Sequence, residues 1–152
     1  MNQNKYMKYL KLIAPILLIL ISFSSFSNVE LETNSVATKV VITKLPFSLE
    51  NLDYVLQQYE VLHRDIVIKQ FILETGWGKS YNFKKRNNLF GLYDSRKHAY
   101  FEFTHWTESV KGYRDLVQFK YKGGDYYKFL KELGYAEDPG YINKLKKIKY
   151  DI

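Results

Sequence analysis

The chain has 152 residues, a formal net charge of +7 at pH 7, no cysteine, and an aromatic content of 17%. The lack of cysteine excludes disulfides, cysteine metal sites and a lipid anchor on an N-terminal cysteine, so a hydrophobic core rich in aromatic side chains must hold the fold. No cofactor or metal is implied, because the three histidines lack metal-ligand spacing and there is no glycine-rich phosphate loop or serine nucleophile motif.

The first 27 residues have the layout of a secretory signal peptide. Three lysines precede the apolar run Leu12–Ile21, and a stretch rich in the small residue serine follows at positions 22–27. The run is ten residues long and contains Pro15, whereas a membrane-spanning helix needs roughly 20 apolar residues. Cleavage after Ser27 and export to the periplasm or the cell exterior are therefore predicted, and retention as a membrane tether is the alternative.

Removal of these residues would lower the formal net charge from +7 to about +4, because three lysines and no acids are lost. A mildly basic protein suits an anionic polymer such as a cell wall, although surface lysines commonly serve solubility. The lysines between positions 144 and 149 are interpreted as a solvated helix face rather than a nucleic-acid site. Residues 28–46 lack a helical period and are predicted to be a flexible tether that precedes a single domain over 47–152.

Two helices are predicted at the start of this domain. Ser48 is a suitable cap for a helix that reaches about Tyr59, in which apolar residues recur every three or four positions. The second helix, from 64 or 65 to Thr75, is apolar on most sides, and Gly76 follows it as a terminating residue. Residues 81–91 have no period and are predicted to be an ordered loop, and 92–103 to be a short hairpin that turns at residues 94–96.

Three more helices are predicted in the last third of the chain. Thr107 caps the first, which ends at Gly123 and Gly124 and has an inward face of Val110, Tyr113, Leu116, Val117 and Phe119. Asp125 caps the next, with Gly134 after its end. Asp138 and Pro139 open the last, which carries Tyr141, Ile142, Leu145 and Ile148. Five helices and one hairpin predict a mainly α-helical domain of the α+β type.

Glu74 is the candidate for chemistry, because it is an acid in the last turn of a strongly apolar helix. The negative end of the helix dipole and the neighbouring apolar side chains both favour its protonated form. A carboxylic acid that remains protonated near neutral pH can act as a general acid. Composition alone would also allow an ordinary exposed glutamate.

The segments around Glu74 resemble the glucosaminidase domain of bacterial autolysins, the flagellar-rod muramidase type. The resemblance is carried by QFILETGWGKS (70–80), NNLFG (87–91), FTHWTESVKGY (103–113) and GYAEDPGYINKL (134–145), and it covers about residues 50–150. It implies a lysozyme-like fold with the hairpin beside an active-site cleft. It further implies hydrolysis of the β-1,4 bond next to N-acetylglucosamine in peptidoglycan. We expect the exported protein to be a monomer.

The resemblance also implies roles for individual residues. Glu74 carries over as the general acid, and Tyr141 is expected near the reaction centre. Candidates for substrate binding are Gln70, Trp77, Asn88, Phe90 and Tyr135. Asn88 could instead fix the loop, Phe90 could belong to the core, and Tyr135 could pack beneath the last helix.

The second catalytic group is less clearly indicated. Glycosidases usually pair two carboxylates, and the only acids in the short hairpin region are Asp94 and Glu102. Alternation places Glu102 on the face opposite Phe101 and Phe103, toward the cleft or toward water, so Glu102 is the candidate. Assistance by the acetamido group of the substrate, with Tyr141 positioning it, is the other route. The remaining alternatives are N-acetylmuramidase activity and a non-catalytic peptidoglycan-binding module.

Overall fold

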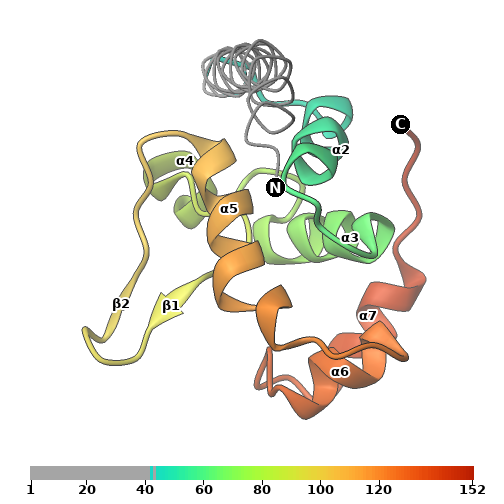
Figure 1. Cartoon of the computed structure of the whole chain (residues 1–152). Helices are drawn as coiled ribbons and strands as arrows, with labels where there is room; N and C mark the ends of the chain where they lie inside the picture. Colours follow the sequence, from blue (N-terminus) through green and yellow to red (C-terminus); the bar gives the residue numbers. More distant parts are fainter. Residues whose placement is uncertain (1–41, 43) are drawn as a thin grey trace, which may run out of the picture. The chain divides into compact units, whose positions relative to one another are not determined.

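The computed structural model describes residue 42 and residues 44–152, and it is mainly helical (Figure 1). The predicted signal peptide and most of the predicted tether lie outside the described residues. The elements are α2 (Leu49–Gln58), α3 (Arg64–Thr75), α4 (Tyr81–Arg86), β1 (Tyr93–Asp94), β2 (Ala99–Tyr100), α5 (Trp106–Leu116), the 3-10 helix η1 (Gln118–Lys120), α6 (Tyr126–Glu132) and α7 (Tyr141–Lys147). Helices with one small antiparallel sheet confirm the predicted fold class, and the arrangement is consistent with a lysozyme-like fold.

The first two predicted helices are confirmed. The residues at their ends explain where α2 begins and where α3 stops. The Ser48 hydroxyl accepts a hydrogen bond from the backbone N–H of Asn51 at 3.1 Å, which satisfies one of the free N–H groups at the start of α2. α3 ends at Gly76, whose φ of 55° lies in the left-handed region that glycine adopts without a steric penalty. Glu74 is thereby fixed in the last turn of α3.

The predicted loop over 81–91 is wrong in its first half, where α4 forms. Ser80 caps this helix by accepting from the backbone N–H of Phe83 at 3.2 Å, and Asn87 ends it in the left-handed conformation. Six residues make fewer than two turns, too few for an apolar period to be visible. Its local signals are the Ser80 cap, the basic residues of its last turn (Lys84, Lys85 and Arg86) and Asn87 after its end.

The hairpin is present but shorter than predicted. Tyr93 pairs with Tyr100 and Asp94 pairs with Ala99, so each strand has two residues. The turn occupies residues 95–98 rather than 94–96, and His98 has a positive φ of 50° within it.

The starts of two later helices differ from the prediction. His105, not Thr107, caps α5, because its side chain accepts from the backbone N–H of Thr107. Before α7, the Asp138 carboxylate accepts from the backbone N–H of Gly140 at 2.8 Å, and the helix begins only at Tyr141. The predicted Asp125 cap of α6 is confirmed, since its carboxylate accepts from the backbone N–H groups of Tyr127 and Lys128.

The inward face of α5 is confirmed only in part. Val110, Tyr113 and Val117 are buried as predicted, whereas Leu116 and Phe119 are exposed. α5 ends at Leu116 and η1 follows, so the predicted continuous helix to Gly123 is wrong. The change from 3.6 to 3.0 residues per turn rotates Phe119 away from the core face.

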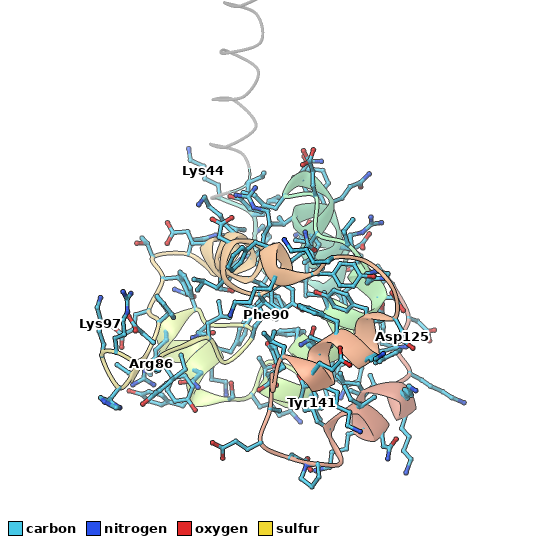
Figure 2. All side chains as sticks on the ribbon, turned by 60° about the horizontal axis from the view of Figure 1, so that its bottom comes forward. Lys44, Arg86, Phe90, Lys97, Asp125 and Tyr141 are labelled. Carbon is cyan, nitrogen blue, oxygen red and sulfur yellow. The ribbon has the colours of Figure 1, made fainter. Side chains whose placement is uncertain are left out.

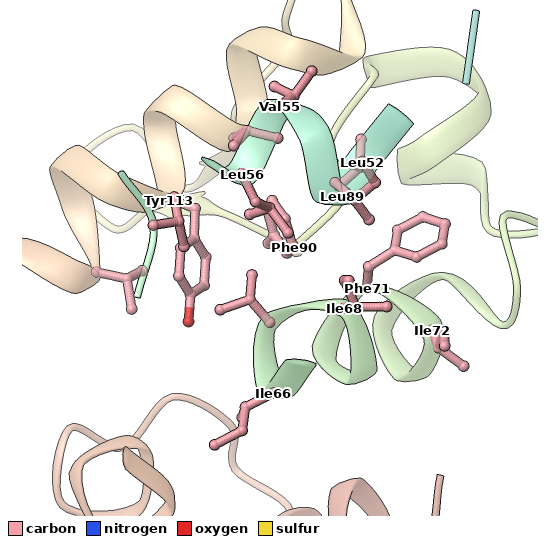
Figure 3. Packing of buried hydrophobic residues seen from close by; sticks show 14 of the residues in the cluster. Leu52, Val55, Leu56, Ile66, Ile68, Phe71, Ile72, Leu89, Phe90 and Tyr113 are labelled. Carbon is pink, nitrogen blue, oxygen red and sulfur yellow. The ribbon is translucent and has the colours of Figure 1, made fainter. Parts of the chain in front are cut away.

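The core surrounds α3, which contacts α2, α4 and α7. Leu52, Val55 and Leu56 of α2 and Ile68 and Phe71 of α3 are fully or almost fully buried in it (Figure 3). Ile42 also belongs to this core, and the carbonyl of Leu45 accepts from the indole N–H of Trp106 at 2.9 Å. The compact unit therefore begins at Ile42, ahead of the predicted boundary at residue 47. Within the part that the structure describes, no helix has the length and apolar character that crossing a membrane requires.

Candidate active site

A cleft of about 880 Å³ lies where the end of α3 meets the hairpin and the segment between α6 and α7. Its walls combine apolar, aromatic and charged side chains. The lining residues are Glu74, Phe90, Gly91, Leu92, Tyr93, Asp94, Ser95, Arg96, Tyr100, Phe101, Leu116, Val117, Lys120, Leu133, Gly134, Tyr135, Ala136 and Glu137. A cleft with a few polar groups on apolar walls is the usual form of a ligand site.

Glu74 lies in the wall of this cleft and is largely buried. The Tyr141 hydroxyl of α7 donates a hydrogen bond to Glu74 Oε1 at 2.8 Å, although the two residues are 67 positions apart in the sequence. Burial raises the pKa of the Glu74 carboxyl, and the Tyr141 hydrogen bond offsets this only in part. Glu74 is therefore held toward the protonated form, as its position in the last turn of an apolar helix predicted.

Gly91 has no side chain, and this leaves space for the Glu74 carboxyl. A Cβ atom at position 91 would stand 3.2 Å from Glu74 Oε2, and the φ of Gly91 is +63°. Both the space and the backbone conformation at this position favour glycine. Oε1 of Glu74 thus faces Tyr141, and Oε2 faces Gly91 in the cleft wall.

The structure does not bring Glu102 into the cleft. Its carboxylate pairs with Arg86 at 3.1 Å, its side chain is 71% exposed, and it does not line the cleft. Alternation along the strand left both the cleft and water open for Glu102, and its side chain lies in water. Asp94, the other acid of the hairpin, lines the cleft with Glu74, as does Glu137.

Asp94 is the last residue of β1, just before the turn of the hairpin, and its carboxyl is held toward the ionised form. Burial acts to raise its pKa, but hydrogen bonds from the backbone N–H groups of Arg96 and Lys97 and the charges of both side chains outweigh it and lower the pKa. The bond from the Arg96 N–H measures 3.0 Å. The cleft therefore contains one carboxyl held toward the protonated form and one held toward the ionised form.

Asn88 and Gln70 lie beneath the cleft surface. The Asn88 carboxamide accepts from the Leu92 N–H and donates to the Leu92 and Phe101 carbonyls, at 2.9 to 3.0 Å. Gln70 is also 0% exposed and hydrogen-bonds to Tyr113 and Tyr141. Neither has exposed surface for a sugar, so Asn88 fits its alternative role of fixing the loop.

Phe90 and Tyr135 belong to both the core and the cleft wall. Phe90 is almost fully buried near the centre of the domain (Figures 2 and 3), yet its edge borders the cleft. The Tyr135 hydroxyl donates to the Phe90 carbonyl at 2.8 Å, and its ring centroid is 5.6 Å from that of Tyr141. Phe90 and Tyr135 therefore pack in the core, as the alternative interpretation predicted, and also border the cleft, as expected for residues near the substrate.

The exposed aromatic side chains divide into two groups. Trp77, predicted to flank the cleft, is 53% exposed with a positive φ of 61°, but it does not line the cleft. Tyr93 and Tyr100 do line it, are nearly half exposed, and face each other across the hairpin with ring centroids 5.2 Å apart. This pair was not predicted from the sequence, although two tyrosines that flank a predicted turn indicate a cross-strand aromatic pair.

Among the described residues, no group of three or more histidine, aspartate or glutamate side chains could hold a metal ion. The chemistry that the site can perform with its own residues is proton donation from Glu74, with a carboxylate and aromatic faces nearby.

Comparison with known proteins identifies one match. Residues 50–152 match the model of the glucosaminidase family, described as mannosyl-glycoprotein endo-beta-N-acetylglucosaminidase. The matched range includes every residue of the cleft. No curated protein and no solved structure matches the chain.

Proposed function

Because this chain belongs to the glucosaminidase family, we propose that it hydrolyses the β-1,4 bond next to N-acetylglucosamine in peptidoglycan strands. The proposed general acid is Glu74. The observation that carries this assignment is the largely buried Glu74 carboxyl in the cleft wall, which has a raised pKa and a hydrogen bond from Tyr141. Family membership supports a glycoside hydrolase that acts on peptidoglycan, and the bond and the residue are our proposal.

In this reaction Glu74 gives its proton to the glycosidic oxygen. The C1–O bond breaks, and its electron pair stays on the oxygen, which leaves as a hydroxyl group. A water molecule adds its oxygen to C1, and its released proton returns the site to its starting state. A protonated acid is required at the first step, which is the form that burial favours for Glu74.

The proposed partner for the developing positive charge at C1 is Asp94 or the acetamido group of the substrate. Asp94 replaces Glu102 as the candidate because Asp94 lines the cleft and Glu102 does not. Asp94→Asn separates the two routes. A loss of turnover about as large as that of a Glu74 variant supports Asp94, whereas near-normal turnover supports the acetamido group.

The test of the general acid compares Glu74→Gln with Glu102→Gln on purified peptidoglycan. Glu74→Gln keeps the shape of the side chain but cannot supply a proton, so turnover falls roughly 100-fold or more while binding persists. Glu102→Gln makes the same chemical change outside the cleft and keeps near-normal turnover. Equal activity of the two variants would place the acid elsewhere.

Mass spectrometry of the released fragments identifies the bond. Reducing-end N-acetylglucosamine supports the proposed glucosaminidase activity, and reducing-end muramic acid supports N-acetylmuramidase activity instead. The non-catalytic alternative predicts that the protein pellets with insoluble peptidoglycan but releases no soluble fragments at any pH.

We also propose an exported, monomeric protein that acts at the cell wall. The support is the layout of residues 1–27 together with the family. An N-terminus of the exported protein at Asn28, measured by mass spectrometry, would establish cleavage of the signal segment.

A further inference from the structure

Four buried or partly buried side chains form a continuous hydrogen-bond chain that ends on Glu74. Tyr126 of α6 contacts the Tyr113 hydroxyl of α5 at 2.9 Å, and that hydroxyl donates to Gln70 Oε1 at 2.6 Å. The Gln70 amide in α3 donates to the Tyr141 hydroxyl of α7 at 3.4 Å. Tyr141 donates to Glu74 Oε1 at 2.8 Å, so the chain joins four helices to one carboxyl oxygen.

The number of hydrogens in this chain fixes its direction. A tyrosine hydroxyl has one hydrogen, and burial raises the pKa of all three tyrosines, to about 12 for Tyr126, so each hydroxyl keeps that hydrogen. Because Tyr113 uses its hydrogen on Gln70, Tyr126 must donate to Tyr113. In each later hydrogen bond, from Gln70 to Tyr141 and from Tyr141 to Glu74, the acceptor is likewise the group nearer to Glu74 along the hydrogen-bond chain.

The opposite direction would leave a buried hydrogen without a partner. If every link were reversed, Tyr126 would accept from Tyr113, and its own hydrogen would need another acceptor. Among the described residues the Tyr126 hydroxyl has no hydrogen-bond partner except Tyr113, and Tyr126 is almost fully buried. A buried donor without an acceptor costs free energy, so the direction toward Glu74 is favoured.

We propose that Tyr126, Tyr113 and Gln70 are positioning residues that keep the Tyr141 hydroxyl a donor to Glu74 Oε1. Oε1 is then always an acceptor, and the acid proton is held on Oε2, the oxygen beside Gly91 in the cleft wall. The use of that proton rests on the proposed function, whereas its placement rests on the hydrogen bonds alone. This role also replaces the expected contact of Gln70 with substrate.

Titration of Glu74 by carbon NMR tests the placement without any substrate. In the full chain with labelled glutamate, the Glu74 carboxyl signal is the one absent from the Glu74→Gln spectrum. The other titratable groups that share the cleft or contact the site are Tyr93, Asp94, Arg96 and Tyr100 of the hairpin, Lys120 of η1, and Tyr135 and Glu137 of the α6–α7 segment. All of these remain in every variant compared below.

Tyr141→Phe removes the hydrogen bond that lowers the pKa of Glu74, so the midpoint of the titration rises. Tyr113→Phe frees Gln70 Oε1 to compete for the Tyr141 hydrogen, and the midpoint rises by less. Tyr126→Phe gives the smallest rise. Tyr121→Phe is the control, because Tyr121 packs against Tyr126 with ring centroids 4.9 Å apart but donates to the Gly124 carbonyl, outside the chain.

Hydrolysis of peptidoglycan gives a second readout. The Tyr113 variant is expected to lose about tenfold in kcat with KM unchanged, because the proton is misplaced while the sugar contacts remain. The descending limb of its pH profile moves to higher pH together with the NMR midpoint. Thermal unfolding identifies variants that do not fold. Tyr126→Phe, which keeps every hydrogen bond of the chain except its own, remains available if Tyr113→Phe unfolds.

A folded Tyr113→Phe variant whose Glu74 titrates as in the unsubstituted protein would overturn the proposal. Tyr113 would then have no influence on the hydrogen bond between Tyr141 and Glu74. A midpoint that rises equally in Tyr121→Phe would overturn it as well. Midpoints that move in the expected order in a protein that cuts no glycan would instead leave the hydrogen-bond chain standing and remove the proposed function.

Discussion

Glu74 is expected to make both activity and stability depend on pH, and the signs follow from its raised pKa. The proposed general acid acts when protonated, so the rate is expected to fall as pH rises through the pKa of Glu74, which lies above the ordinary carboxyl value. A carboxyl whose pKa is higher in the folded state stabilises the fold below its unfolded pKa, and this is lost as pH rises through the folded pKa. Glu74→Gln is therefore expected to raise Tm relative to the unsubstituted chain more at neutral than at acid pH. A Tm difference that does not change with pH would contradict this.

Gly91 is expected to matter for catalysis beyond its backbone conformation. Gly91→Ala places a methyl group 3.2 Å from Glu74 Oε2 and adds a positive-φ penalty of about 1–2 kcal/mol. Gly123→Ala is the control, because Gly123 also has a positive φ but has nothing within 4 Å of its Cβ position. Both variants should lose stability in thermal unfolding, and only Gly91→Ala should lose turnover, roughly tenfold or more. Equal turnover would show that Glu74 adapts to the added methyl group.

The hairpin is expected to bind sugar through its two tyrosines. Pyranose rings bury their apolar faces on aromatic rings, and Tyr93 and Tyr100 present nearly half-exposed rings at the cleft. Tyr93→Ala or Tyr100→Ala should raise KM about five- to tenfold with little change in kcat, equivalent to roughly 1 kcal/mol of binding. The control is Tyr81→Ala, since Tyr81 is exposed and stacks with Arg86 but does not line the cleft. An unchanged KM in both hairpin variants would exclude them from the site.

Elements whose ends carry a strong local signal could be predicted from the sequence, and others could not. Ser48, Gly76 and Asp125 marked the ends of helices correctly, because cap chemistry is decided within one turn. α4 is too short for a period, and the true cap of α5 is a histidine, a residue that propensity does not favour at that position. Local rules therefore placed the long helices but not the short connections between them.

The same limit applies to the site. Glu74 and Tyr141 could be paired only through the family resemblance, since 67 residues separate them. Glu102 and Asp94 could not be distinguished, because strands of two residues have too little alternation to fix a face. The buried position of the Gln70 carboxamide depends on Tyr113 of α5 and Tyr141 of α7, which hydrogen-bond to it and lie 43 and 71 residues further along the chain.

The folded unit as a whole is expected to need the segment just before the predicted domain. Ile42 is buried in the core, Leu45 packs against it, and the Leu45 carbonyl binds the Trp106 indole (Figure 1 shows α5, which carries Trp106). Without disulfides, such contacts are a large share of a small stability. A fragment that begins at residue 47 loses one buried isoleucine, about 1.5–3 kcal/mol, and the hydrogen bond from Trp106 to the Leu45 carbonyl, about 1 kcal/mol. The exposed hydrogen bond from the Asn51 amide to the Pro46 carbonyl is lost as well, and it adds little.

Denaturant unfolding of two fragments, one beginning at residue 41 and one at residue 47, measures this contribution. Both lack residues 1–40, so the difference between them reports only the segment that contains Ile42 and Leu45. The shorter fragment should have a free energy of unfolding lower by about 3 kcal/mol. A third fragment that begins at residue 41 and carries Ile42→Ala separates the core contact from the hydrogen bond. It keeps the hydrogen bond but not the buried isoleucine, so it should reproduce most of the loss, about 1.5–3 kcal/mol. Equal stability of the fragments beginning at 41 and 47 would instead return the domain boundary to residue 47, because neither Ile42 nor the Leu45 carbonyl would then contribute to the fold.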